Sequence, residues 1–71
     1  MNNKEFQKMI NRIKELREEN HLTQLEVAKI LHINRTVYNR YENGKREPPI
    51  SFIFDLAKLY QVTIDDLLGL E

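Results

Sequence analysis

The sequence predicts an all-α fold of five short helices. Apolar side chains recur at helical spacing along the chain, and no segment alternates between polar and apolar residues as a strand does. The breaks carry the few Gly and Pro residues and small polar clusters. With 71 residues, the chain allows one small domain, 1–71, burying only about 60 % of its unfolded surface. Because Cys is absent, helix packing or an oligomer interface must stabilise it.

The first helix is predicted over residues 4–19, where one face is apolar: Phe6, Met9, Ile10, Ile13 and Leu16. Asn2 or Asn3 is expected to accept hydrogen bonds from its first free N–H groups. Asn20 is expected to end the helix in the left-handed backbone conformation, which Asn tolerates.

The second helix is predicted over residues 24–31. Thr23 and Glu26 have the spacing of a capping box, in which each side chain binds the other residue's backbone N–H. Leu22 and Val27 are placed to form a hydrophobic staple. The buried stripe of this helix is predicted to be Val27, Ala28 and Leu31.

Three further helices are predicted after a short turn at 32–33. Asn34 can cap a helix over residues 35–43, and Gly44 can end it. The next helix runs from Pro49 to residue 60, and Thr63, with Asp66 three residues later, opens the last one. The apolar residues assigned to these two final helices are Ile50, Ile53, Phe54, Leu56, Ala57 and Tyr60, then Ile64, Leu67 and Leu68.

Charge is unevenly distributed although the chain has 11 basic and 11 acidic residues. Residues 29–47 carry five basic and two acidic side chains, whereas residues 48–71 carry one basic and four acidic. This asymmetry suggests a local surface for an anionic partner. Random scatter of surface charge is the alternative.

The helix over 35–43 separates polar from apolar side chains. At about 100° per residue, Val37, Tyr38 and Tyr41 fall on one side, and the other side has the residue types that read base edges. Arg can bind guanine, Asn can bind adenine, and the Thr methyl can contact thymine. The side chains concerned are Arg35, Thr36, Asn39 and Arg40. An ordinary solvated face is the alternative for this helix alone.

The two helices around the turn together form a helix-turn-helix, a unit that places its second helix in the DNA major groove. Gln24 begins the first of these helices, where exposed N–H groups can hold a phosphate. Lys45 and Arg46 follow the second helix and suit phosphate contacts.

The segments LTQLEVAKILHINRTVYNRYENGKREP (22–48) and ISFIFDLAKLYQVTIDDLL (50–68) resemble the DNA-binding domain of the Cro and lambda-repressor-like (Xre) helix-turn-helix family. With RIKELREENHLT (12–23), the resemblance covers about residues 12–68. It implies the five-helix lambda-repressor-like fold. One departure is His32, where the family commonly has Gly; His at positive φ carries some strain.

The resemblance also implies a role for individual residues. Gln24 matches a phosphate-binding glutamine, and Ala28 matches a small residue packed between the two helices. Tyr38 and Tyr41 match buried positions. The groove-facing positions are Arg35, Thr36, Asn39 and Arg40, and the phosphate contacts after the helix are Asn43, Lys45 and Arg46.

The expected function is a sequence-specific regulator of transcription that binds double-stranded DNA. We expect a repressor that binds an inverted-repeat operator as a homodimer. The candidate dimer surface is Ile64, Leu68 and Leu70, although these residues could instead complete the monomer core. The alternative function is an antitoxin that binds a protein toxin and its own operator, and a further open alternative is modulation of another regulator.

Other classes of function are disfavoured. Ser51 is the single serine, the adjacent Asp65 and Asp66 point about 100° apart on a helix, and no phosphate-cradling Gly loop exists, so no enzyme is expected. His21 and His32 are too few for a metal site, and no cofactor is expected. No apolar run approaches the roughly 18 residues of a membrane span, and no signal peptide follows Met1. The expected location is the cytoplasm, at the nucleoid, without a membrane partner.

Overall fold

The computed structural model describes residues 3–70, and this part of the chain contains helices and no strand. The helices are α1 (Asn3–Glu19), α2 (Gln24–Ile30), α3 (Arg35–Glu42), α4 (Ile50–Tyr60) and α5 (Ile64–Leu67). The predicted all-α, five-helix fold is therefore confirmed over these residues. None of their helices has the length and apolar character needed to cross a membrane.

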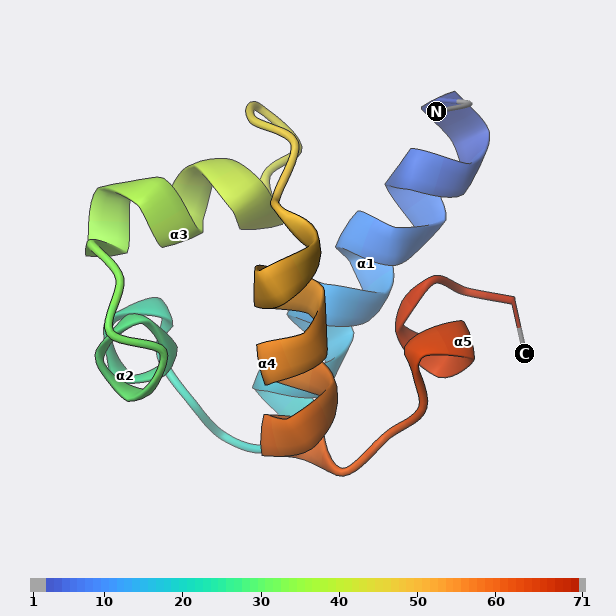
Figure 1. The fold of residues 1–71 in the computed structure, drawn as a ribbon. Helices are drawn as coiled ribbons and strands as arrows, with labels where there is room; N and C mark the ends of the chain where they lie inside the picture. Colours follow the sequence, from blue (N-terminus) through green and yellow to red (C-terminus); the bar gives the residue numbers. More distant parts are fainter. Residues whose placement is uncertain (1–2, 71) are drawn as a thin grey trace.

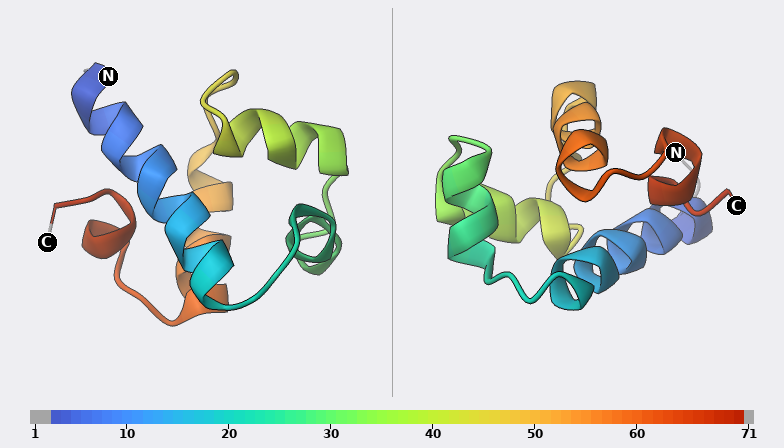
Figure 2. Two further views of the ribbon diagram at one scale, coloured as in Figure 1. Left: turned by 180° about the vertical axis from the view of Figure 1, so that it is seen from behind. Right: turned by 90° about the horizontal axis from the view of Figure 1, so that it is seen from below.

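The helices are arranged around α4 and α1, which cross in the middle of the molecule (Figure 1). The α2–α3 pair lies on one side and α5 lies on the other, as the two views of Figure 2 also show. Helix α1 contacts both α3 and α5, so it spans the molecule from one side to the other. The α2–α3 pair is thus left with one open face.

All five helices contribute to one hydrophobic core. Its centre is aromatic: the rings of Tyr41 and Phe52 meet edge to face at 4.8 Å, and Tyr38 lies 5.9 Å from Phe52. Such pairs stabilise a core beyond the area that they bury. The other buried apolar residues of the core cluster are Met9, Ile13, Leu16, Val27, Ala28, Ile53, Leu56, Tyr60 and Leu67.

The predicted apolar face of α4 is partly wrong. Ile50 is 66 % exposed and Phe54 is 51 % exposed, whereas Phe52, which the sequence analysis did not assign, is buried. Ile50 and Phe54 are four residues apart and share one edge of the helix, turned away from the buried stripe of Phe52, Ile53, Leu56 and Tyr60. Because the apolar residues of α4 cover more than half of its circumference, and only Ser51, Asp55 and Lys58 form a polar stripe, periodicity could not decide which edge of the apolar face is buried.

The predicted helix starts are confirmed where a side chain caps them. Thr23 Oγ1 accepts from the Glu26 backbone N–H at 3.0 Å, and Glu26 Oε1 accepts from the Thr23 N–H at 2.8 Å. The hydrogen bond from the Thr23 backbone N–H, followed by one from the Thr23 side chain, holds the pKa of the Glu26 carboxyl below its usual value. Asn34 and Thr63 cap α3 and α5 in the same way, by accepting from backbone N–H groups of the first turn.

Several helix ends differ from the prediction. The left-handed residue after α1 is His21 (φ 56°), not Asn20, whose Nδ2 instead donates to the Leu16 carbonyl at 2.8 Å. Helices α2 and α3 each stop one residue earlier than predicted, and α4 begins one residue after Pro49. The proposed cap by Asn2 or Asn3 lies outside the described side chains.

Two predicted turn residues do adopt positive φ. His32 has φ 57° and Gly44 has φ 72°. His32 therefore holds the conformation that glycine prefers, and the turn between α2 and α3 forms in spite of the departure from the family pattern. At Gly44, a Cβ would lie 2.5 Å from Ile10 Cδ1, so the close approach of α1 adds a second reason for glycine there.

Candidate nucleic-acid interface

Helices α2 and α3 form a packed helix-turn-helix unit. In Figure 1, α2 is seen end-on while α3 lies across the view, so the two helices cross steeply. Val27 and Ala28 on α2 and Tyr38 on α3 are fully buried, in agreement with a small residue at position 28. The backbone N–H of Ile33 donates to the Ala28 carbonyl at 3.0 Å, which anchors the turn to α2. The unit is therefore held rigidly enough to present one face.

The polar face of α3 is open to solvent. Arg35, Thr36 and Arg40 are exposed, and Asn39 is half-buried. Arg35, Thr36 and Asn39 line an open depression on this surface. On the opposite side of α3, Tyr38 and Tyr41 are buried and Val37 packs against the core, so the predicted separation of the two sides is confirmed.

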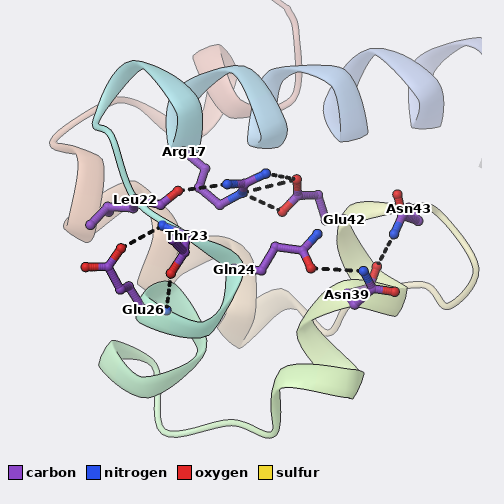
Figure 3. A network of polar contacts seen from close by, with 8 residues as sticks. All are labelled: Arg17, Leu22, Thr23, Gln24, Glu26, Asn39, Glu42 and Asn43. Carbon is purple, nitrogen blue, oxygen red and sulfur yellow. Dashed lines mark hydrogen bonds and ion pairs between the residues drawn. The ribbon is translucent and has the colours of Figure 1, made fainter.

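The predicted phosphate-binding residues lie around this face. Gln24 is the first residue of α2, and its Oε1 accepts a hydrogen bond from Asn39 Nδ2 at 3.0 Å (Figure 3). Asn43 is exposed at the end of α3, where its Nδ2 donates to the Asn39 carbonyl at 3.0 Å. Lys45 and Arg46 are exposed in the loop that follows. The structure thus brings the candidates together on the α2–α3 side of the molecule.

A buried ion pair behind this surface was missed by the sequence analysis. Arg17 donates to Glu42 through Nε, at 3.0 and 3.2 Å, and through Nη2, at 2.9 Å. Its Nη1 donates to the Leu22 carbonyl at 2.7 Å (Figure 3). These bonds join α1, the segment before α2 and the last residue of α3. The hydrogen bonds to Glu42 hold the pKa of Arg17 above its usual value.

One signal for this pair was present in the sequence. Arg17 follows Ile13 by four residues on α1, and Glu42 follows Tyr38 by four residues on α3, so each charge adjoins a buried stripe. The hydroxyl groups of Tyr38 and Tyr60 are also buried, without a hydrogen-bond partner among the described residues. Burial is the main cause that raises the pKa of both hydroxyl groups, and the Glu42 carboxylate adds to it; the pKa of Tyr60 rises to about 12.

A second ion pair joins α1 to α5. Arg12 Nε lies 2.9 Å from Asp66 Oδ1, and Arg12 Nη2 lies 3.1 Å from Asp66 Oδ2. Arg12 also contacts Glu15 and, at 3.7 Å, Glu19. The hydrogen bonds from Arg12 lower the pKa of the Asp66 carboxyl. Asp66 therefore has a role that its place in the α5 cap did not predict.

The residues predicted for a dimer surface differ in exposure. Ile64 and Leu68 are partly buried and pack against the core, whereas Leu70 is 66 % exposed. Their arrangement leaves Leu70 as the main apolar side chain of this group on the surface. Within residues 3–70, no three His, Asp or Glu side chains gather as metal ligands would.

The α2–α3 unit lies within a segment that matches a known protein family. The model of the family described as "Helix-turn-helix" matches residues 13–67, which include the α2–α3 unit and its packing partners. No solved structure matches the chain at a significant level.

Individual relatives carry regulatory names. The HTH-type transcriptional activator BcrR of Enterococcus faecalis is 35 % identical over 58 residues, covering 82 % of this chain and 28 % of the relative. The cryptic phage CTXphi transcriptional repressor RstR of Vibrio cholerae is 36 % identical over 59 residues, covering 83 % of this chain and 53 % of the relative. Antitoxin PezA of Streptococcus pneumoniae is 39 % identical over 57 residues, covering 80 % of this chain and 36 % of the relative. The chain thus spans about half or less of the length of these relatives.

Proposed function

The chain belongs to the Cro and lambda-repressor-like (Xre) helix-turn-helix family, and from this premise we propose that it regulates transcription by binding specific sequences of double-stranded DNA. The observation that carries the proposal is the open polar face of α3, held on a packed helix-turn-helix unit beside the first residue of α2. A helix in this position enters the major groove while the preceding helix crosses the backbone.

The residues divide by the DNA group that each can reach. Arg35, Thr36 and Arg40 are exposed on the groove-facing side and would contact base edges. The phosphate contacts would come from Gln24, Asn43, Lys45 and Arg46, which border that face. Asn39 shares the surface, but it is half-buried and its Nδ2 donates to Gln24 Oε1. The proposed role is one of binding, without catalysis and without a cofactor.

We further propose a repressor that binds an inverted-repeat operator as a homodimer, at the nucleoid in the cytoplasm. The name of the phage relative supports repression, and the name of the Enterococcus relative shows that activation also occurs among similar proteins. Two-fold dimers match half-sites about one helical turn apart. The proposed dimer surface is Ile64, Leu68 and Leu70, and it centres on Leu70 because this residue is 66 % exposed.

The test is selection of bound duplexes from a random DNA pool at about 150 mM salt with nonspecific competitor, because purely electrostatic binding weakens there. Enrichment of an inverted repeat is expected. Failure to enrich any sequence, with a protein whose circular dichroism shows it to be folded, would contradict the proposal.

Two substitutions separate base contacts from phosphate contacts. Arg40→Ala should reduce preference for the selected operator by about 1–3 kcal/mol at one base pair, because a bidentate contact is lost. Lys45→Ala should weaken binding to all duplexes alike. It should also reduce the slope of the logarithm of the binding constant against the logarithm of the salt concentration by about one. Fluorescence anisotropy on specific and random duplexes measures both. Equal effects of the two substitutions on both duplexes would contradict these assignments.

The dimer surface has its own test. Leu70→Glu should shift sedimentation of the free protein toward the monomer while leaving its melting temperature near that of the wild type, because the side chain is already exposed. The matched control is Leu25→Glu, which places the same charge at an exposed leucine on α2. A dimer that persists in Leu70→Glu would rule out this surface.

An antitoxin that binds both a toxin and its own operator is the second candidate, favoured by the 39 % identity to antitoxin PezA. Such a protein would keep the DNA site and add a protein partner. Co-purification from cells that express the neighbouring gene distinguishes the two: a stoichiometric complex supports the antitoxin.

A further inference from the structure

Asn39 differs from the other polar residues on the open face of α3. Arg35, Thr36 and Arg40 are exposed, whereas Asn39 is half-buried. Its side-chain amide is turned toward α2 and donates to Gln24 Oε1 at 3.0 Å, across 15 residues of sequence (Figure 3). Asn39 is therefore already bonded within the protein at the interface proposed for DNA.

This bond determines which end of the Gln24 amide remains available. Phosphate oxygens accept hydrogen bonds and donate none, so an outward Oε1 would be repelled and an outward Nε2 would be attracted. Oε1 is occupied by Asn39, and Nε2 donates no hydrogen bond to the described residues, so its N–H groups can donate to a ligand. A bidentate contact to adenine, by contrast, needs an Asn amide that reaches the base freely.

The surroundings hold this arrangement in place. The backbone carbonyl of Asn39 accepts a hydrogen bond from Asn43 Nδ2 at 3.0 Å, at the end of α3. The neighbouring residue Glu42 is tied to Arg17, which also binds the Leu22 carbonyl just before α2. The first turn of α2 and the last turn of α3 are thus fixed relative to each other, so little ordering is needed when DNA binds.

We propose that Asn39 is a positioning residue: it orients the Gln24 amide so that Nε2 donates to a DNA phosphate, and it contributes affinity without reading a base. This inference rests on the proposed DNA-binding function. It predicts that Asn39 and Gln24 act as a unit, whereas Arg35, Thr36 and Arg40 each act on a base pair.

A double-mutant cycle tests the coupling. Gln24→Ala and Asn39→Ala should each weaken binding about tenfold, as expected for loss of one hydrogen bond to a charged group, on the selected operator and on a random duplex alike. In the Gln24→Ala background, Asn39→Ala should add less than about a twofold loss. A new base preference in Asn39→Ala, or the same loss with and without Gln24, would overturn the proposal.

A second variant and a control keep the test independent of folding. Asn39→Asp preserves the side-chain shape, but its side chain cannot donate to Gln24 Oε1. In the wild-type background it should weaken DNA binding both by losing this bond and by repelling the DNA phosphates. In the Gln24→Ala background only the repulsion remains, so the loss should be smaller. Thr36→Ala is the matched control and should alter preference at one base pair without coupling to Gln24. If the wild-type chain selects no duplex, the proposed function fails; if it selects an operator and the cycle is additive, only the role of Asn39 fails.

Discussion

Glu42 is a charged residue that is only 2 % exposed, and its negative charge can stay buried because Arg17 pairs with it. Removing a buried charge from water costs several kcal/mol, which the pair recovers only when its hydrogen bonds are complete. Here Arg17 supplies three contacts to the carboxylate and one to the Leu22 carbonyl. The pair fixes where α3 ends relative to α2, and this position determines the geometry of the proposed DNA interface.

Glu42→Gln should therefore destabilise the fold by about 3–5 kcal/mol, because Arg17 keeps its charge without a carboxylate to neutralise it. A chain of this length has a total stability of only about 4–11 kcal/mol, so urea unfolding at low temperature is the suitable measurement. The double variant Arg17→Met/Glu42→Leu removes both charges and should be more stable than Glu42→Gln. A double variant as unstable as the single one would show that shape, not charge, dominates.

At the scale of helices, three residues other than glycine within residues 3–70 hold the left-handed conformation at helix ends: His21, His32 and Gln61. An L-residue in this conformation costs about 1–2 kcal/mol, so each end stores strain. The starts of α2, α3 and α5, in contrast, are capped by Thr23, Asn34 and Thr63, whose side chains accept hydrogen bonds from backbone N–H groups. These three starts are thus stabilised by hydrogen bonds, whereas the ends at His21, His32 and Gln61 carry strain.

His32→Gly should raise stability by about 0.5–1 kcal/mol, since relief of the left-handed strain exceeds the entropy that Gly adds to the unfolded chain. For a domain of this size the melting temperature should rise by several degrees. Lys29→Gly, at an exposed position within α2, is the control and should lower it by a similar amount. A lower melting temperature for His32→Gly would mean that the His side chain makes contacts that outweigh the strain.

At the scale of the whole molecule, the Arg12–Asp66 pair connects residues 54 positions apart and holds α5 against α1. Helix α5 has only four residues and could not persist alone. Its position therefore depends on Leu67 in the core and on this ion pair at the surface. Because Leu68 and Leu70 follow directly, the same contact also places the proposed dimer surface.

Stability should consequently depend on Asp66 in acid. Its pKa is lowered in the folded state, so its contribution is present above the unfolded value of about 3.9 and is lost as pH falls through the folded-state pKa. Urea unfolding from pH 7 to pH 2 should show wild type more stable than Asp66→Asn at neutral pH, with the difference closing below about pH 4. Asp65→Asn is the control, and a pH-independent difference for Asp66→Asn would refute the link.

The sequence alone determined the features that depend on neighbours within about four residues. The five helices, their side-chain caps, the buried Tyr38 and Tyr41, and the exposed polar face of α3 follow from local spacing, because helix periodicity and capping are short-range effects. The resemblance to a known family supplied the residue roles, and the family itself is confirmed.

Only the tertiary structure decided the contacts between distant segments. Phe52 rather than Phe54 enters the core, Arg17 meets Glu42 across 25 residues, and Asn39 binds Gln24 across 15. Each depends on how whole helices are turned and placed, and spacing within one helix carries no information about its neighbours. The polar bonds that shape the candidate interface therefore emerge when α1, α2 and α3 pack together.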